Sequence, residues 1–262
     1  MSSLKNIAKL VKQAKDVDTS PAKQFLEYLD RAIVMSERQN QRPPSMTYKP
    51  SSLGGCRRRV YFEVTGALID PNPSIDPSGV GIMESGTDRH ERIQEYVIKM
   101  KELGIPCEWI DVEEYLKMYP QKGTRVIEKK GYETKLRNDV LNLSFMCDGI
   151  IKMDGKYYIL EIKTEASFKW NGRTDAEAKH KVQAACYSVA LGIDDIIFLY
   201  EQRDFCKKKP FHVHVTDEDK DTHVIHEINT IEDYRERKEV PDKTTKKSEC
   251  NYCPFKEECK KW

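Results

Sequence analysis

The chain has 262 residues, which is long enough for one or two domains with a sizeable hydrophobic core, and therefore for an enzyme. Its 44 lysines and arginines nearly balance its 43 aspartates and glutamates, so the net charge of +1 excludes a protein that binds nucleic acid through its overall field. No segment reaches the ~20 apolar residues of a membrane span, and the N-terminus lacks the apolar core of a signal peptide, so we expect a cytoplasmic protein with no membrane partner.

The N-terminal region is predicted to be helical. Leu4, Ile7 and Val11 recur at helical spacing among lysines, and a second helix is expected over residues 20 to 38. A Pro- and Ser-rich stretch from 43 to 52 is typical of a linker. We therefore divide the chain into an N-terminal helical extension, residues 1–45, and a main domain, residues 46–262.

A short helix near residues 57 to 65 and a loop from 70 to 79 are expected next. Between residues 86 and 103 the apolar positions form a helical stripe, which Gly104 should end. His90 lies on that stripe, where a histidine is more often a core residue than a ligand. Strand-like segments follow between residues 107 and 136.

Residues 153 to 156 have the chemistry of a tight hairpin turn. Asp154-Gly155 between alternating apolar runs is a strong signal for a two-residue type I′ loop, which would pair Met153 with Lys156. Counting outward from this pair places Asp148 directly opposite Glu161.

This register predicts a metal site. Because strand side chains alternate, Glu161 and Lys163 should share one face of the strand, while Leu160 and Ile162 point into apolar packing. Directly opposed Cβ atoms are about 4.5 to 5.5 Å apart, so two carboxylates there repel each other unless a cation or a proton lies between them.

The alternative is a surface hairpin with solvated carboxylates. Both strands, however, carry apolar residues on both faces, which is typical of a central, buried pair. A helix is expected over residues 176 to 191, with Gly192 as its stop, followed by strands at 196 to 200 and 211 to 215. The order of elements predicts an α/β fold with a mixed sheet flanked by helices.

Eight cysteines in a cytosolic chain favour metal or cluster ligation over disulfides. Cys250, Cys253 and Cys259 fall in a short polar segment, residues 250–259, and Cys56 is the best candidate for a fourth ligand. Four thiolates suit either zinc or an iron-sulfur cluster, and spacing alone leaves both open. Either one would clamp the two ends of the chain together.

These motifs together resemble those of RecB-like PD-(D/E)XK nucleases that carry an iron-sulfur cluster. The similarity is greatest to the CRISPR-associated RecB-like exonucleases and their phage-encoded relatives, and it covers roughly residue 50 to the C-terminus. The residues that carry it are Gly86-x-x-x-His90, Asp148, Glu161-x-Lys163, Gln183-x-x-x-Tyr187 and the four cysteines. Cys147 stands where the family's name pattern has a proline.

The resemblance implies a restriction-endonuclease-like core with added N-terminal helices and a four-cysteine staple. It implies that His90, Asp148, Glu161 and the Ile162 carbonyl hold Mg²⁺ or Mn²⁺, while Lys163 orients or activates the attacking water. Gln183 and Tyr187, one helical turn apart, would contact DNA or position the lysine. Cys56, Cys250, Cys253 and Cys259 would hold a 4Fe-4S cluster, with zinc as the alternative.

We therefore expect a metal-dependent deoxyribonuclease, an exonuclease acting on single-stranded DNA ends. Its expected setting is recombination and repair, phage DNA processing or CRISPR adaptation, with helicase, recombination or CRISPR-adaptation proteins as partners. One alternative is a DNA-binding adaptor subunit that keeps the nuclease scaffold without turnover. Another is a cysteine-rich protein for electron transfer or metal sensing, which would not need Asp148.

Overall fold

The computed structural model describes residues 20–71 and 73–262. The helical pattern expected around Leu4 to Val11 lies outside the described residues. The described residues divide into two compact units, 20–42 with 74–83, and 43–71, 73 and 84–262. No helix in the described part is both long and apolar enough to cross a membrane.

The first unit contains helix α2, Pro21–Gln39, which confirms the helix expected there. Ser20 caps it by accepting a hydrogen bond from the Lys23 N–H. Pro21 suits the first turn, because a backbone N–H at that position would have no hydrogen-bond partner within the helix. The first residues of α4, Pro77–Glu102, also belong to this unit. The loop expected over 70–79 therefore ends earlier than predicted, where Pro77 begins the helix.

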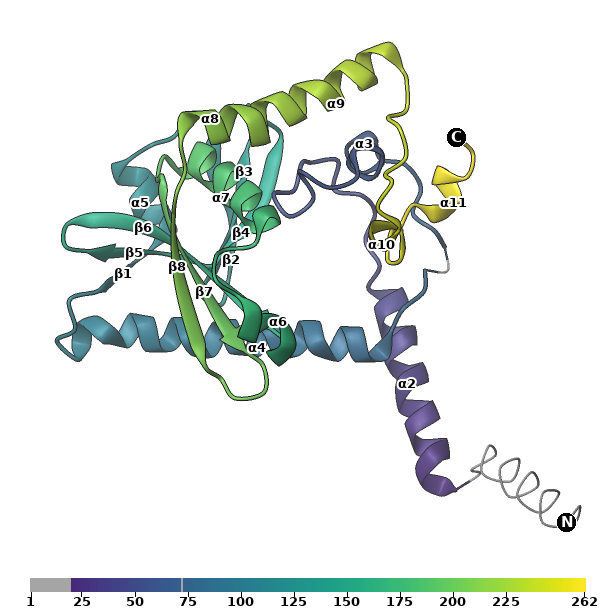
Figure 1. Ribbon diagram of the computed structural model, residues 1–262, viewed down its shortest axis with the longest axis horizontal. Coiled ribbons are helices and arrows are strands. Elements are labelled where there is room, and N and C mark those ends of the chain that lie inside the picture. The colour runs from purple at the N-terminus through teal and green to yellow at the C-terminus, as the bar shows by residue number, and fades with distance from the viewer. Residues whose placement is uncertain (1–19, 72) are drawn as a thin grey trace, which may run out of the picture. The chain divides into compact units, whose positions relative to one another are not determined.

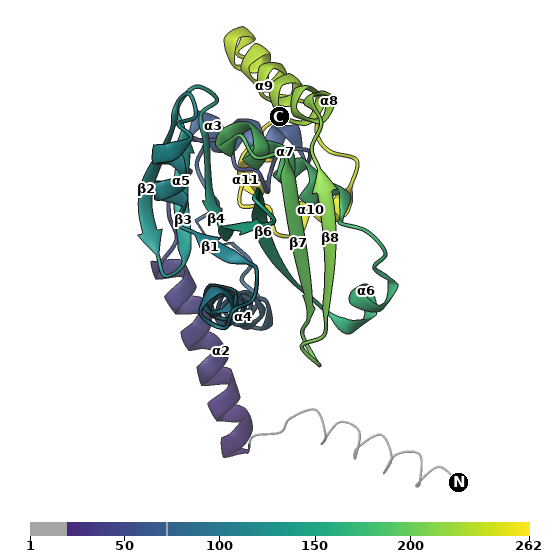
Figure 2. The same cartoon turned by 90° about the vertical axis from the view of Figure 1, so that its left-hand side faces the viewer.

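The second unit contains all the strands and the remaining helices (Figures 1 and 2). Its elements after α3 (Arg57–Thr65) and the rest of α4 are β1 (Glu108–Ile110), α5 (Val112–Met118), β2 (Thr124–Lys130), β3 (Glu133–Asn138), β4 (Leu143–Cys147), β5 (Gly149–Met153), β6 (Lys156–Glu165), α6 (Ser167–Gly172), α7 (Ala178–Leu191), β7 (Asp195–Gln202), β8 (Lys208–His214), α8 (Asp217–Lys220), a π-helical turn η1 (Asp221–Ile225), α9 (His226–Arg237), α10 (Lys247–Cys250) and α11 (Lys256–Cys259).

Two sheets lie beside each other in this unit (Figure 2). The larger has the strand order β1-β5-β6-β7-β8, in which β6 and β7 are parallel and the other neighbours antiparallel. The smaller, β2-β3-β4, is antiparallel. The predicted mixed sheet flanked by helices is confirmed.

Helices cover both faces of the larger sheet. Ile93 and Val97 of α4 pack on Leu160 and Ile162, whereas α7 packs on the opposite face against residues that include Ile159. The alternation predicted for β6 is therefore confirmed, because Leu160 and Ile162 lie in an apolar layer. The strand is enclosed on both sides.

The predicted hairpin is also confirmed. Asp154 and Gly155 have φ angles of 49° and 80°, as a type I′ turn requires, and Met153 pairs with Lys156. The register continues to Gly149 opposite Leu160. Gly149 is needed for packing, since a Cβ there would lie 2.2 Å from the Trp109 ring.

Several expectations for the rest of the chain are wrong. The segment 43–52 is no free linker, because Tyr48 is fully buried and its hydroxyl donates to Glu232 at 2.6 Å. The strand-like region 107–136 contains the helix α5, which Asp111 caps by accepting from the N–H groups of Glu113 and Glu114. The helices α6, α8 and α9 were not expected.

Candidate metal centre

Asp148 lies at the break between β4 and β5, where the chain passes from the smaller sheet to the larger one. Its carboxylate Oδ2 accepts a hydrogen bond from the Ile162 N–H at 2.7 Å, and its carbonyl accepts one from Gln94 Nε2 at 2.6 Å. The side chain is buried. A central strand and α4 thus fix the position of this carboxylate.

His90 of α4 and Glu133 of β3 converge on Asp148. His90 Nδ1 lies 3.4 Å from Asp148 Oδ2 and 3.7 Å from Glu133 Oε1. Each of the three residues offers a ligand atom within 4.8 Å of the other two. Burial opposes protonation of the imidazole, yet the carboxylates of Asp148 and Glu133 raise the pKa of His90 to about 10.

Glu133 is a candidate ligand that sequence reasoning missed. It begins β3, directly after the turn at Gly131 and Tyr132, in a charged hairpin where a glutamate carries no distinctive spacing. Only the pairing of β3 with β4, which leads to Asp148, brings it to the site. No local signal could have found it.

Glu161 and Lys163 share the face of β6 that meets α7. Lys163 Nζ lies 2.5 Å from Glu161 Oε1 and donates to Gln183 Oε1 at 3.0 Å. The Gln183 amide donates to Glu161 Oε1 at 2.9 Å and also to the Tyr187 hydroxyl. Gln183 and Tyr187 therefore hold the acidic and basic groups of the strand in place.

Glu161 stands outside the group formed by His90, Glu133 and Asp148. Its Oε1 faces the ammonium and amide just described, whereas its Oε2 is buried and has no hydrogen-bond partner. Burial, followed by the charge of Asp148, raises the pKa of Glu161 to about 7 against the opposing effect of Lys163. The structure thus brings together the expected ligands His90 and Asp148 and sets Glu161 beside them.

The donors fit a divalent cation. Glu133, Asp148 and Glu161 bring three negative charges and Lys163 one positive charge, so the site carries −2 when His90 is neutral. An orphaned, buried carboxylate oxygen is costly unless a proton or a cation satisfies it. Carboxylate oxygens with one imidazole suit Mg²⁺ or Mn²⁺, and the imidazole makes Mn²⁺ at least as suitable.

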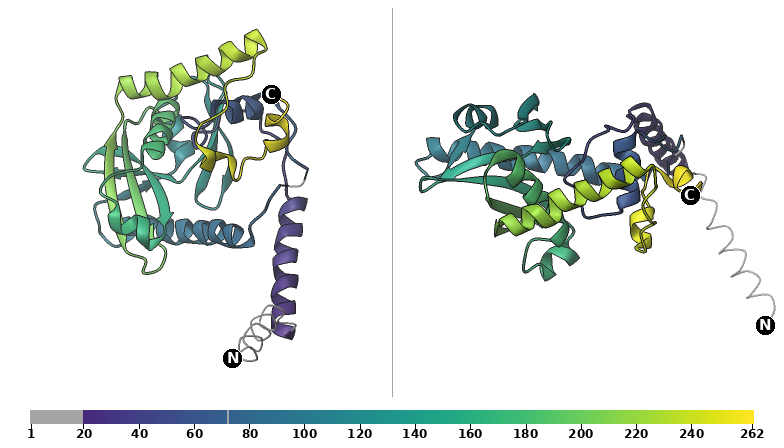
Figure 3. Two further views of the ribbon diagram at one scale, coloured as in Figure 1. Left: turned by 45° about the vertical axis from the view of Figure 1, so that its right-hand side comes forward. Right: turned by 90° about the horizontal axis from the view of Figure 1, so that it is seen from above.

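The C-terminal segment with α10 and α11, yellow in Figure 3, lies near α3. Arg58 Nη1 donates to Cys259 Sγ at 3.7 Å, and burial, with a smaller contribution from the neighbouring thiols of Cys56 and Cys259, raises the pKa of Cys253. Cys250 precedes Cys253 by one turn. In the described chain, no three of these sulfur atoms lie within 4.8 Å of one another.

Contacts other than cysteine hold the C-terminal segment to residues 58–70. The Asp70 carboxylate accepts from the N–H groups of Lys256 and Glu257 at 3.1 and 2.9 Å, which caps α11. The rings of Phe62 and Phe255 are 5.8 Å apart. The C-terminal segment is therefore in contact with residues 58–70, while the predicted cysteine staple stays a prediction.

No protein-family model matches this chain. No curated protein matches it by sequence. Among solved structures, the fold is similar to the crystal structure of a protein called SSO0001, with a TM-score of 0.46 and 18% identity over 88% of this chain and 94% of that one. It is also similar to an alkaline exonuclease, LHK-Exo, from Laribacter hongkongensis, with a TM-score of 0.40 and 12% identity over 74% and 94% of the two chains. The functional argument therefore depends on the site residues themselves.

Proposed function

We propose that this protein is a metal-dependent nuclease that hydrolyses DNA phosphodiester bonds. The observation that carries the proposal is the buried carboxylate pair Asp148 and Glu161 with the Lys163 ammonium 2.5 Å from Glu161. Two buried acids beside a lysine, with an imidazole 3.4 Å away, form an acidic centre that a divalent cation would complete.

His90, Asp148, Glu161 and the Ile162 carbonyl would hold the cation, and Glu133 lies close enough to join them. A bound Mg²⁺ or Mn²⁺ supplies Lewis-acid chemistry, namely a polarised phosphoryl oxygen and a water of lower pKa. The protein supplies fixed positions for these ligands. The Asp148 carboxylate accepts a hydrogen bond from the Ile162 N–H, which fixes its position relative to β6, the strand that carries Glu161.

Lys163 is the residue that would meet the attacking water or the scissile phosphate. Two of its three N–H donors are taken by Glu161 and Gln183, which leaves the third for the substrate side. Gln183 contacts both partners of the ion pair, so it is a positioning residue in this mechanism. Tyr187 fixes Gln183 in turn.

The finer assignments rest on the resemblance to RecB-like PD-(D/E)XK nucleases. On that basis the substrate is a single-stranded DNA end, the reaction is exonucleolytic, and Cys56, Cys250, Cys253 and Cys259 hold a structural 4Fe-4S cluster. Proteins of recombination or CRISPR adaptation are the partners to test. The placement of the C-terminal segment against residues 58–70, next in the chain to Cys56, supports the cluster assignment.

Cleavage of end-labelled DNA tests the proposal. Purified protein is incubated with 5′- and 3′-labelled single strands and duplexes, with Mn²⁺, with Mg²⁺ or with chelator. We expect metal-dependent cleavage of the single strand, and a loss of about 10²- to 10⁴-fold in Lys163→Ala and Asp148→Ala. Lys156→Ala, at the exposed end of the same strand, is the matched control.

Binding without cleavage by the wild-type protein would overturn the proposal and support the DNA-binding adaptor instead. Cleavage by Lys163→Ala at the wild-type rate would show that the centre around Asp148 is not the catalytic one. The labelled ends also report polarity, because shortening from one end leaves the other label on a series of products.

A further inference from the structure

The connection between β6 and α7 carries an exposed aromatic side chain beside the metal centre. Phe168 of α6 is 78% exposed. It lines a pocket of about 180 Å³ that reaches Lys163 of the metal centre. Its lining also includes Glu165, Lys169, Glu177, His180 and Arg203.

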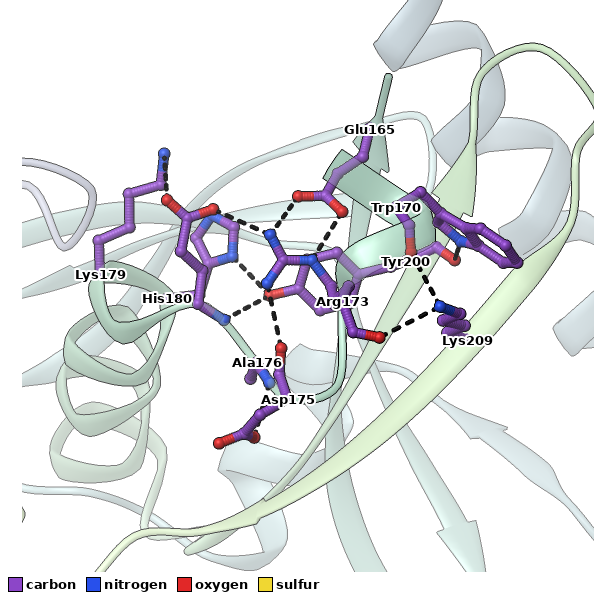
Figure 4. Close-up of polar contacts among 10 residues, drawn as sticks. Glu165, Trp170, Arg173, Asp175, Ala176, Lys179, His180, Tyr200 and Lys209 are labelled. Carbon is purple, nitrogen blue, oxygen red and sulfur yellow. Dashed lines mark hydrogen bonds and ion pairs between the residues drawn. The ribbon is translucent and has the colours of Figure 1, made fainter. Parts of the chain in front are cut away.

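Arg173 fixes this connection to the central strands (Figure 4). Arg173 forms two hydrogen bonds to the carboxylate of Glu165, and its guanidinium lies 4.5 Å over the ring of Tyr200. Both Glu165 and Tyr200 belong to the central strands and are buried. A bidentate, stacked arginine of this kind fixes the chain that carries it.

Lys209 of β8 holds the other side of the loop. Its ammonium lies 4.2 Å over the Trp170 ring and donates to the carbonyls of Trp170 and Arg173 at 2.8 and 3.1 Å. The Trp170 indole N–H donates to the Tyr200 carbonyl at 3.3 Å. Neighbouring side chains are thus anchored, while Phe168 is left to solvent.

The start of α7 is tied to the same tyrosine. The Tyr200 hydroxyl accepts from the Glu177 N–H at 3.0 Å and lies 2.7 Å from His180 Nδ1. Burial, followed by the charges of Lys163, Lys179, Arg173 and Lys169, lowers the pKa of His180 to about 3. The imidazole is therefore neutral in a positively charged neighbourhood.

The pocket has an excess of positive charge. Its two acids are satisfied, because Glu165 pairs with Arg173, and Glu177 with Arg173 and Lys179. No ion pair involves Lys169 or Arg203 within residues 20–71 and 73–262. These two cationic groups lie around an exposed aromatic ring, which is the combination that binds single-stranded nucleic acids.

We propose that this pocket holds the DNA strand next to the scissile phosphate, with Phe168 stacked on a base and Lys169 and Arg203 contacting backbone phosphates. The inference rests on the proposed nuclease function and adds a substrate path to it. Lys163 lines both the metal centre and the pocket, so a strand lying in the pocket is continuous with the site of hydrolysis. An unpaired base offers a face for stacking, which a base within a duplex does not, so the pocket selects single strands.

Equilibrium binding without turnover tests this path. Fluorescence anisotropy with a labelled single-stranded DNA is measured in EDTA, where no cleavage occurs. We expect Phe168→Ala to weaken binding about 5- to 150-fold, the range for losing one stacked base, and Phe168→Trp to bind like the wild type. Phe205→Ala is the matched control, since Phe205 is also 70% exposed but does not line the pocket.

The salt dependence tests the charged part of the pocket. Lys169→Gln should reduce the slope of log K against log salt by about 0.7, the value for one phosphate contact on a single strand. Lys117→Gln, which removes an exposed lysine on α5, should leave the slope unchanged. Thermal unfolding of each variant is measured to check that the fold is retained.

Each outcome of these experiments supports or overturns the substrate path or the nuclease proposal. Equal losses in Phe168→Ala and Phe205→Ala, an unchanged affinity in Phe168→Ala, or a wild-type protein that prefers duplex or RNA would overturn the path. If Phe168→Ala loses binding but the wild type cleaves nothing, the path stands and the nuclease proposal fails. If Phe168→Ala binds normally while Lys163→Ala stops cleavage, the nuclease stands and the path fails.

Discussion

The Asp148 carboxylate accepts its hydrogen bond from the backbone N–H of Ile162, at 2.7 Å. The N–H and C=O groups of one strand residue point to the same side of the strand. The Ile162 carbonyl is therefore directed to the side on which Asp148 lies, as expected of the ligand that the family resemblance implies. One residue of β6 thus orients an acid through its N–H and offers an oxygen through its carbonyl.

Metal binding should release protons. The pKa of His90 is raised to about 10 and that of Glu161 to about 7, so at pH 7 the imidazole is protonated and Glu161 partly so. Both must lose their protons to become ligands. Calorimetric titration with Mn²⁺ in two buffers of different ionisation enthalpy should show the release of about one proton or more, and affinity that rises with pH. Heats that do not depend on the buffer would contradict the ligand set.

The metal-free protein should lose stability as pH rises from about 4.5 to about 10. Glu161 has a folded pKa above its ordinary 4.5, so the folded state holds the extra proton between about 4.5 and 7, and its contribution is lost as pH rises through that window. His90, raised from 6.5 to about 10, contributes below about 6.5 and loses that contribution towards 10. Thermal unfolding in EDTA at a series of pH values measures how the melting temperature falls with pH. Glu161→Gln should remove the part of this fall between about pH 4.5 and 7, and saturating Mn²⁺ should restore the melting temperature above pH 7.

Gly149 should not tolerate a side chain. A Cβ there would lie 2.2 Å from Trp109, and overpacking of this kind costs about 1 to 3 kcal/mol. Because Gly149 follows Asp148, Gly149→Ala should lower both the melting temperature and the affinity for Mn²⁺. Gly172→Ala, where the added Cβ meets nothing within 4 Å, is the control. A second change, Trp109→Leu, should recover part of the metal affinity if steric contact is the cause.

Gln183 should matter for rate more than for metal binding. It accepts from Lys163 at 3.0 Å and donates to Glu161 at 2.9 Å, so Gln183→Leu frees both groups without removing a ligand. We expect a loss of about 10- to 100-fold in the rate constant for cleavage, with little change in Mn²⁺ affinity. Gln183→Glu keeps an acceptor for Lys163 and should retain more activity. Equal loss in both variants would point to packing instead.

The four cysteines should hold iron. Protein purified without oxygen should be brown and contain roughly four irons per chain, whereas stoichiometric zinc would favour a zinc-stapled fold. Cys253→Ser should lose the colour and expose the segment after Pro241 to protease, while Asp148 and its hydrogen bond to β6 remain. Cys186→Ser is the control, because that thiol belongs to α7 and is buried in the hydrophobic core.

Local chemistry explains what could be predicted from the sequence. The Asp154-Gly155 turn sets its own pairing, so the approach of Asp148 to Glu161 and Ile162 followed from counting residues. The helix α5 had a local signal as well, since Asp111 precedes two glutamates in a capping arrangement. The strand-like residues on either side of α5 led to the prediction of strands throughout this region.

Glu133 could not be predicted, because its position depends on how the smaller sheet lies beside the larger one. The end of α6 has the same difficulty, since Arg173 reaches Glu165 and Tyr200 only after β6 and β7 have paired. Contacts made between elements leave no periodic trace in the sequence. They account for most of what the structure adds to the site.

The turn at residues 154–155 also constrains how this protein can change over time. Adding or removing one residue there, without a compensating bulge, would shift β5 against β6 by one position and leave Asp148 opposite an apolar residue. The sheet would survive, but the carboxylates of Asp148 and Glu161, the proposed ligands, would lie on opposite faces of the sheet. Natural length variation at this loop is therefore expected in steps of two, while the exposed loops elsewhere can vary freely.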